Sequence, residues 1–407
     1  MTVKKKKPEI RFKGFTGEWE ERELRDVAID TYGGGTPKTS VVEYWNGNIP
    51  WIQSSDLAEE KLSNIVLRKS ITEKGIKDSA TKLVPENSIA IVTRVGVGKL
   101  ALMPYCYATS QDFLSLSKLK IDSWFCVYSI WKKIQSELHA VQGTSIKGIT
   151  KEELLSKKIM VPFQITEQSQ IGTYFQNLDS LISLHQRKYD KLTTVKKAML
   201  EKMFPKDGAD IPEIRFKWFT GKWERRKIGD ILTEKKCPIE LEDNKLYELV
   251  TVKRRNGGVV SRGFLKGKDI LVKNYFEIRA GDYIISKRQV VHGANGIVPQ
   301  SLDKTIVSNE YLVAAGNENI TTAFWTIISK QPDMYKKFFL SSYGVDIEKL
   351  FFDVEDWKKR IIAIPALLEQ KRITGYFEKL DSLISLHQRE LDKLKTIKKS
   401  CLEKMFV

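Results

Sequence analysis

Apolar residues recur with helical spacing along two long stretches of the chain, which end at Phe204 and Phe406. In each stretch a core position returns every seventh residue with further apolar rows beside it, a pattern typical of an amphipathic helix. Each apolar stripe needs a partner surface, so we predict that the two helices pack along each other within the chain. The predicted core positions are Leu178, His185 and Leu192 in the first helix and Leu380, His387 and Leu394 in the second.

Two segments of the sequence each occur twice in the chain. The string LDSLISLHQR occurs at residues 178–187 and again at 380–389, and PEIRFKGFTGEW at 8–19 returns as PEIRFKWFTGKW at 212–223. These two shorter segments, called the leaders, differ by Gly14 against Trp218 and by Glu18 against Lys222. We therefore predict two tandem halves, each built from a leader, a globular domain and a long helix.

Between leader and helix, short β-branched and aromatic runs bounded by turn residues indicate strands. The predicted strands are 48–53, 88–93, 100–104, 247–252, 283–286 and 295–298, and the segments 124–138 and 322–339 have helical spacing. The predicted fold class is α+β: two mixed α/β domains separated by two long antiparallel amphipathic helices that form an intramolecular coiled coil, in a pseudo-two-fold tandem repeat. The predicted boundaries are 1–160 and 205–363 for the domains with their leaders, and 161–204 and 364–407 for the helical spacers.

The two globular domains have a similar order of predicted elements but different amino-acid sequences. The leaders and helices match almost letter for letter, whereas residues 88–103 and 282–299, which occupy corresponding places, share little sequence. Such a chain has one scaffold that holds two different readers. We therefore expect the domains to read two different things, at a separation that the helices set.

The charge of the chain narrows the class of partner. Its 407 residues carry a formal net charge of +17 at pH 7, which favours a polyanionic partner such as nucleic acid. The alternative explanation of this charge is a proteome that is generally rich in lysine. The cysteines lie far apart without a CxxC pair, which argues against a disulfide framework or a zinc site. No apolar run has membrane length, and no signal peptide follows the first lysines. We expect a soluble cytoplasmic protein.

Several short motifs resemble the specificity subunit of Type I restriction–modification systems. GGGTP at 33–37, YW at 44–45, IPWI at 49–52 and DL at 56–57 are similar to the opening of a target recognition domain in that family. The segments VPFQITEQ and IPALLEQ, which precede the two helices, resemble the family's conserved helical regions. The first of them has one residue more than the second, which argues against strict two-fold equivalence at this point.

The resemblance implies a non-catalytic reader of double-stranded DNA, in which each recognition domain binds one part of a bipartite, asymmetric target. It implies that the helices act as a spacer and dock two modification (methyltransferase) subunits, to which restriction (endonuclease and translocase) subunits add. S-adenosylmethionine is then expected in the modification subunit, and this chain is expected to bind no cofactor itself.

Readout of bases and phosphates needs cationic and hydrogen-bonding side chains on loops. In the first domain the candidates on or beside predicted loops are Lys38, Ser54, Ser55, Arg94, Lys99, Gln111 and Lys147. In the second they are Lys253, Arg254, Arg255, Asn256, Lys287, Arg288, Gln289, His292 and Asn309. Each alone is equally well explained as a solvated surface residue, so the prediction rests on the clusters.

Other chemistries fit the sequence less well. The run Gly96-Val-Gly98-Lys99 lacks a glycine and a Ser or Thr that a P-loop requires, so tight turns are the better interpretation. His185 and His387 fall at the same core position and are expected to fix register, because a metal site would need further ligands.

The alternative function is a stand-alone DNA methyltransferase or nuclease. The sequence lacks the clustered carboxylates of a metal-dependent nuclease and the Asn/Asp-Pro-Pro-aromatic site of a methyltransferase, so we predict no catalytic residues. A third interpretation, a coiled-coil scaffold that binds no DNA, would leave the basic excess and the two divergent domains without a purpose.

Overall fold

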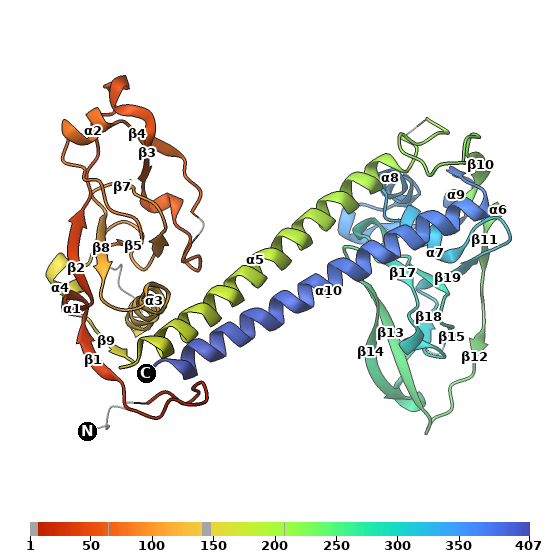
Figure 1. Cartoon of the computed structure of the whole chain (residues 1–407). Helices are drawn as coiled ribbons and strands as arrows, with labels where there is room; N and C mark the ends of the chain where they lie inside the picture. Colours follow the sequence, from red (N-terminus) through yellow and green to blue (C-terminus); the bar gives the residue numbers. More distant parts are fainter. Residues whose placement is uncertain (1–6, 64, 141–147, 207, 273) are drawn as a thin grey trace. The chain divides into compact units, whose positions relative to one another are not determined.

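The computed structural model describes residues 7–63, 65–140, 148–206, 208–272 and 274–407. The chain forms two compact units: unit 1 is Met1–Lys188 with His387–Val407, and unit 2 is Tyr189–Leu386. Each unit contains one globular domain and part of each of two long helices, α5 (Ile165–Lys202) and α10 (Leu367–Met405) (Figure 1). Both predicted helices are thus present.

The globular domain of unit 1 is built on two sheets. Its strands are β2 (Ala28–Gly33), β3 (Trp45–Ile52), β4 (Lys69–Ile71), β5 (Ser88–Val92), β6 (Leu100–Met103), β7 (Ala108–Thr109) and β8 (Phe113–Leu119). The four-stranded sheet has the order β2-β8-β5-β6, with antiparallel neighbours. The three-stranded sheet has the order β4-β3-β7, in which β3 and β7 are parallel.

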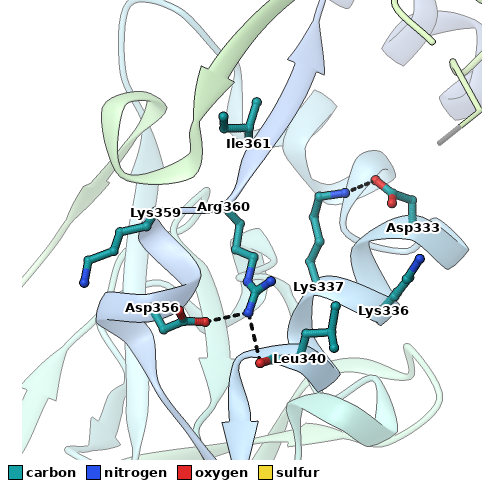
Figure 2. Close-up of a pocket in the computed structure, with 8 residues that line it drawn as sticks. All are labelled: Asp333, Lys336, Lys337, Leu340, Asp356, Lys359, Arg360 and Ile361. Atoms are coloured by element: carbon teal, nitrogen blue, oxygen red, sulfur yellow. Dashed lines mark hydrogen bonds and ion pairs between the residues drawn. The ribbon is translucent and has the colours of Figure 1, made fainter. Parts of the chain in front are cut away.

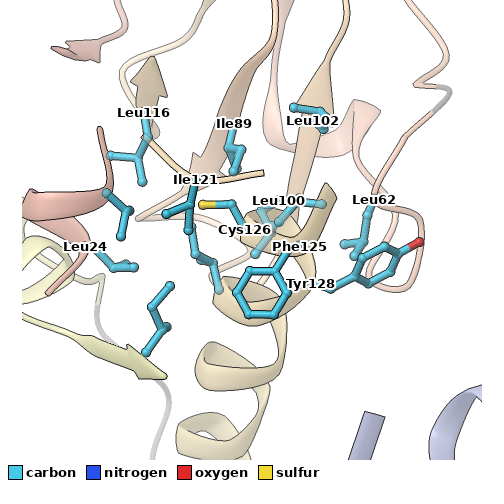
Figure 3. Close-up of a cluster of buried hydrophobic side chains, with 14 of the residues drawn as sticks. Leu24, Leu62, Ile89, Leu100, Leu102, Leu116, Ile121, Phe125, Cys126 and Tyr128 are labelled. Carbon is cyan, nitrogen blue, oxygen red and sulfur yellow. The ribbon is translucent and has the colours of Figure 1, made fainter. Parts of the chain in front are cut away.

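The four-stranded sheet of unit 1 is covered on both faces. On β5, Ile89 belongs to the core shared with α3 (Ser123–Ala140), and the next residue, Ala90, belongs to the core on the opposite face. Figure 3 shows Phe125 and Cys126 of α3 within the first of these cores. Because both faces are buried, residues 89–92 of β5 form an uninterrupted apolar run instead of an alternating one. The sheet is therefore a firm base for the loops at its ends.

Unit 2 repeats the four-stranded sheet and enlarges the second one. Its strands are β11 (Leu232–Glu234), β12 (Pro238–Ile239), β13 (Leu246–Lys253), β14 (Gly258–Lys266), β15 (Tyr275–Glu277), β16 (Tyr283–Ser286), β17 (Asn295–Ile297), β18 (Ile306–Ser308) and β19 (Tyr311–Gly316). The sheet β11-β19-β16-β17 has the same connectivity as β2-β8-β5-β6. The second sheet has the order β12-β15-β18-β13-β14. The six predicted strands all lie on strands of the two units.

The predicted helical segment 322–339 is divided in the structure. It forms α7 (Thr322–Ile328) and α8 (Pro332–Leu340), because Pro332 starts a new helix at its first position. Its counterpart in unit 1, α3, is a single helix of 18 residues. Further short helices and strands include α1 (Leu24–Val27), α2 (Glu73–Lys77), α4 (Lys151–Leu155), α6 (Ile228–Ile231), α9 (Val354–Lys358), β20 (Ser342–Tyr343) and β21 (Phe351–Phe352).

The repeated leaders tie each globular domain to the helices. After the leader, β1 (Glu20–Glu23) pairs with β9 (Lys158–Val161) in unit 1, and β10 (Glu224–Lys227) pairs with β22 (Ile361–Ile364) in unit 2. In both units the second strand of the pair leads directly to the start of a long helix.

A buried ion pair explains the arginine that both leaders contain. Arg11 Nε and Nη2 donate to the two carboxylate oxygens of Glu167 on α5 at 2.5 and 2.7 Å. Arg215 makes the same bidentate pair with Glu369 on α10, at 2.7 and 2.6 Å. Each glutamate is only 1% exposed. The pair therefore survives the extra residue that precedes α5, and the two helix starts are equivalent in this contact.

The two helices run antiparallel. In unit 1, the Tyr174 hydroxyl lies 3.4 Å from Cys401 Sγ, and His185 Nδ1 lies 3.1 Å from His387 Nδ1. Positions that increase along α5 thus meet positions that decrease along α10. In unit 2 the same direction continues, because Lys196 pairs with Asp381.

The predicted core positions of the helix pair differ in burial. Leu178 and Leu380 are 6% and 7% exposed. Leu192 and Leu394 are half-buried and pack against the cores of units 2 and 1, respectively. Among the described residues, every helix is either too short or too polar to cross a membrane.

Candidate nucleic-acid interface

Four loops of unit 1 meet at one edge of its sheets. Register pairs Gly33, the last residue of β2, with Leu114, and Val92, the last residue of β5, with Phe113. The backbone also joins the loops: Gly35 N–H donates to the Thr109 carbonyl at 2.8 Å, and Ser110 N–H to the Ile52 carbonyl at 2.9 Å. The loops that follow β2, β3, β5 and β7 therefore lie together.

Six of the seven predicted side chains of the first domain lie on these loops, and we call them cluster 1: Lys38, Ser54, Ser55, Arg94, Lys99 and Gln111. Lys99 Nζ donates to the Ser54 carbonyl at 3.5 Å. Arg94 is exposed just beyond β5. The seventh, Lys147, lies outside the described residues.

The structure places three further residues beside cluster 1 that were not among the candidates from the sequence. The Thr36 hydroxyl donates to Gln111 Oε1 at 2.7 Å and so fixes the amide of that glutamine. The Asp56 side chain, 1% exposed, accepts the backbone N–H of Gln53 at 3.0 Å and lies 3.5 Å from Arg68 Nε. Thr36 is the threonine of the GGGTP motif, so the sequence did contain a signal for it, whereas nothing in the sequence connects Arg68 with Asp56.

The glycines of the loops that carry cluster 1 serve close packing and turns. A Cβ on Gly34 would lie 1.9 Å from the Ser110 carbonyl oxygen, so this place admits no side chain. Gly96 and Gly98 have φ of +88° and +102°, which only glycine adopts readily. These features agree with tight turns between β5 and β6.

Unit 2 gathers its predicted residues in the corresponding place, and we call them cluster 2: Lys253, Arg254, Arg255, Asn256, Lys287, Arg288, Gln289, His292 and Asn309. The β13–β14 turn is bound to the loop after β16, because Arg255 N–H donates to the His292 carbonyl at 2.7 Å and Asn256 N–H to the Gly293 carbonyl at 3.0 Å. Lys287 Nζ donates to the Asn309 carbonyl at 2.8 Å.

Two arginines of cluster 2 have acidic partners that the sequence did not indicate. Arg254 Nη2 lies 2.8 Å from Glu348 Oε2, and Arg288 Nε lies 2.9 Å from Glu310 Oε2. The Arg288 guanidinium also lies 5.4 Å from the centre of the Phe351 ring. All four charged side chains are about half exposed. These ion pairs therefore position the arginines, but breaking them costs little free energy.

A charged hollow of about 480 Å³ lies between α8, α9 and β22 (Figure 2). Its arginine and one lysine are engaged, since Arg360 pairs with Asp356 at 2.7 Å and Lys337 pairs with Asp333. A hollow of about 640 Å³ occupies the equivalent place in unit 1, where Lys157 pairs with a glutamate at 2.6 Å. Because these charges pair within the protein, we assign both hollows to helix packing and not to DNA readout.

The two core histidines hydrogen-bond to each other instead of gathering ligands. The Nδ1 atoms lie 3.1 Å apart, so one ring donates a hydrogen bond and the other, in its neutral form, accepts it. Burial, together with His185 and Lys188, lowers the pKa of His387. Within the described part of the chain, His, Cys, Asp and Glu side chains form no group of three that could hold a metal ion.

Comparison with known proteins identifies the family. The family model described as the Type I restriction modification DNA specificity domain matches the chain at residues 16–194 and 220–396. The specificity subunit of the Type I restriction enzyme MjaIX of Methanocaldococcus jannaschii is 28% identical over 226 residues, which are 53% of this chain and 52% of that protein. A Type I restriction enzyme specificity subunit of Escherichia coli is 32% identical over 193 residues, 43% of this chain and 47% of that protein. The chain thus spans about half the length of these relatives.

A solved structure has the same fold over nearly its whole length. The S subunit of a Type I restriction–modification system from M. genitalium covers 98% of this chain and 99% of its own, with a TM-score of 0.54 and 15% identity. The two matches of the family model fall on the two halves that the repeat defines and together cover most of the sequence. The chain belongs to the family of Type I restriction–modification DNA specificity domains, with one such domain in each half.

Proposed function

We propose that this chain is a non-catalytic, sequence-specific DNA-recognition subunit of a Type I restriction–modification complex. The observation that carries the proposal is the pair of loop clusters. Each half holds cationic and amide side chains at the same edge of an equivalent sheet, but the two sets differ in residue type and spacing. Equivalent scaffolds with different loops suit a bipartite, asymmetric DNA target, because each domain then reads a different part.

The clusters contain the groups that both kinds of DNA contact need. Lysines such as Lys38 and Lys253, both exposed, neutralise phosphates and make binding weaker as salt rises. Arg94, Gln111 and Asn256 offer donors and acceptors that match base edges in the major groove. Arg254 and Arg288 exchange a glutamate for DNA when they bind, and their exposed ion pairs make that exchange inexpensive.

The partners follow from the family. Two modification subunits dock on the scaffold that the two halves share, namely the leaders and long helices, and restriction subunits join through them. S-adenosylmethionine then binds to the modification subunits, and this chain holds no cofactor. The complex acts on double-stranded DNA in the cytoplasm.

The alternative, an enzyme that methylates or cuts DNA by itself, is supported by neither cluster. Cluster 1 consists of cations, hydroxyls and an amide, and cluster 2 of cations, amides and a histidine, whereas methyl transfer needs a cofactor loop and metal-dependent cleavage needs paired acids. Incubation of the purified chain with S-adenosylmethionine and DNA should give no methylation until the modification subunit is added. Methylation by the chain alone would favour the alternative.

A domain exchange tests the proposal. Residues 20–155 are replaced by the equivalent domain of a relative, and methylated sites are mapped in cells that also contain the modification subunit. We expect one part of the target to change and the other to remain, because each cluster belongs to one unit. The matched variant, an exchange of the second domain, should change the other part. An exchange that alters both parts at once would contradict the modular assignment.

A further inference from the structure

The second leader carries an exposed tryptophan in a strained backbone conformation. Trp218 is 87% exposed and has φ of +87°, which is rare and unfavourable for any residue with a bulky side chain. It is the third residue of a turn that is closed by a 3.3 Å hydrogen bond from Phe219 N–H to the Phe216 carbonyl. This position in such a turn normally takes glycine.

The first leader shows what this position requires structurally. Its equivalent residue is Gly14, with φ of +99°. The two turns have the same support: Phe12 packs edge-to-face on Tyr174 with ring centres 6.0 Å apart, and Phe216 packs in the same way on Tyr376 at 5.9 Å. The fold therefore forms with glycine here, and the tryptophan adds strain without adding a buried contact. A strained, exposed aromatic residue indicates a function.

The other difference between the leaders lies four residues further along the chain. Glu18 of the first leader is replaced by Lys222 in the second, and both are exposed. Lys217 Nζ also lies 5.6 Å from the Trp218 ring centre. The second leader thus differs from the first by one large apolar group and by a change of charge from negative to positive. These features fit an apolar pocket with an acidic rim.

A protein pocket suits this surface better than DNA does. In a duplex the base faces are already stacked, so a surface tryptophan gains little there, whereas phosphate contacts would need only the lysines. Tryptophan is enriched among the few residues that contribute most to protein–protein binding. The partner that meets both leaders is the one that docks on the repeated scaffold.

We propose that Trp218, with Lys217 and Lys222, anchors one of the two modification subunits, so that the second half of the chain binds its subunit more tightly than the first half does. This inference rests on the proposed function. It goes beyond that function because it makes the two docking positions unequal and the assembly stepwise, with the second half occupied first.

The internal repeat supplies matched variants. In Trp218→Gly the second leader receives the residue of the first, and in Gly14→Trp the first receives that of the second. A Cβ on Gly14 would meet no heavy atom within 4 Å, so the strain that Gly14→Trp adds comes from the positive φ, as it does at Trp218. Trp218→Gly should raise the Tm by about 2–4 °C through relief of strain, which also shows that the variant is folded.

Binding is measured by calorimetric titration of the full chain with the purified modification subunit. The unchanged chain should show two sites whose affinities differ by about 30-fold. Trp218→Gly should weaken the tighter site to the level of the other, and Gly14→Trp should tighten the weaker one. Two equal sites in the unchanged chain, or unchanged binding by Trp218→Gly, would overturn this inference but leave the proposed function intact.

Two other outcomes have separate meanings. If the unchanged chain binds no modification subunit, the proposed function itself fails, and the inference fails with it. If Trp218→Gly weakens binding to duplex DNA while subunit binding stays the same, the tryptophan belongs to the DNA interface, and the docking assignment is wrong.

Discussion

Arg94 and Arg288 occupy the same place in the two halves, each two residues beyond the end of a central strand, β5 or β16. Their surroundings differ, since Arg94 is exposed at the start of a glycine-rich turn and Arg288 is paired with Glu310. Replacing Arg94 by alanine should cost about 1–3 kcal/mol of DNA binding if the guanidinium reads a base. A phosphate contact should cost less and make the salt dependence shallower. Binding titrations at several salt concentrations distinguish these results.

The controls for this prediction come from the same domains. Lys118→Ala removes an exposed cation near the far end of β8 and should leave affinity nearly unchanged. Glu310→Gln should strengthen DNA binding, because it frees Arg288 and removes a negative charge near the phosphates. A loss of affinity in Glu310→Gln would mean that the glutamate positions the arginine instead of competing with DNA for it.

At the scale of elements, each leader is attached to a helix start by a buried ion pair. Arg215→Ala leaves the carboxylate of Glu369, 1% exposed, without its cationic partner, and should reduce the free energy of unfolding by about 3–5 kcal/mol. Arg11→Ala should do the same in unit 1. The matched control is Arg225→Ala, whose pair with Asp210 is more exposed and should matter by at most about 1 kcal/mol. Urea unfolding checks this; equal effects of Arg215→Ala and Arg225→Ala would contradict it.

The histidine pair gives the helices a dependence on pH. The folded chain holds the pKa of His387 below its ordinary value, chiefly through burial, so the unfolded chain binds more protons as pH falls through the ordinary histidine range. The contribution of the histidine pair to the free energy of unfolding should therefore be fully present above about pH 7 and should decrease as the pH drops below about 6.5. Urea midpoints measured between pH 8 and 5 test this. The variant His185→Leu with His387→Leu should lose that part of the pH dependence, and an unchanged profile would count against the pair.

At the scale of the whole molecule, the proposed spacer role of the helices makes a prediction about the target. Four residues inserted near Lys197 add just over one turn, or about 6 Å, to α5, which is close to two base pairs of rise. We expect the unread gap of the DNA target to lengthen while both recognised parts stay the same. Methylation mapping of the variant decides this, because an unchanged gap with full activity would show that the helices do not measure the distance.

Much of this architecture is determined by local properties of the sequence. The duplicated leaders and the seven-residue spacing indicate two halves and two long helices, because periodicity and repetition need no knowledge of distant contacts. The six strands were predictable from short β-branched and aromatic runs bounded by turn residues, which are also local signals. Pro332 also indicates the division between α7 and α8, although the continuous helical spacing of 322–339 favoured a single helix.

The tertiary structure decided which residues form a site and which charges are free. The loops that carry Thr36, Ser54, Arg94 and Gln111 lie together because strand register places the ends of β2, β3, β5 and β7 at one edge, and register depends on pairing between distant segments. Likewise, the attachment of Arg254 to Glu348 joins residues 94 positions apart. Composition alone predicts a basic surface, but only the folded chain shows which of its cations already have a carboxylate beside them, because ion pairing depends on distance in space and not on order in the sequence.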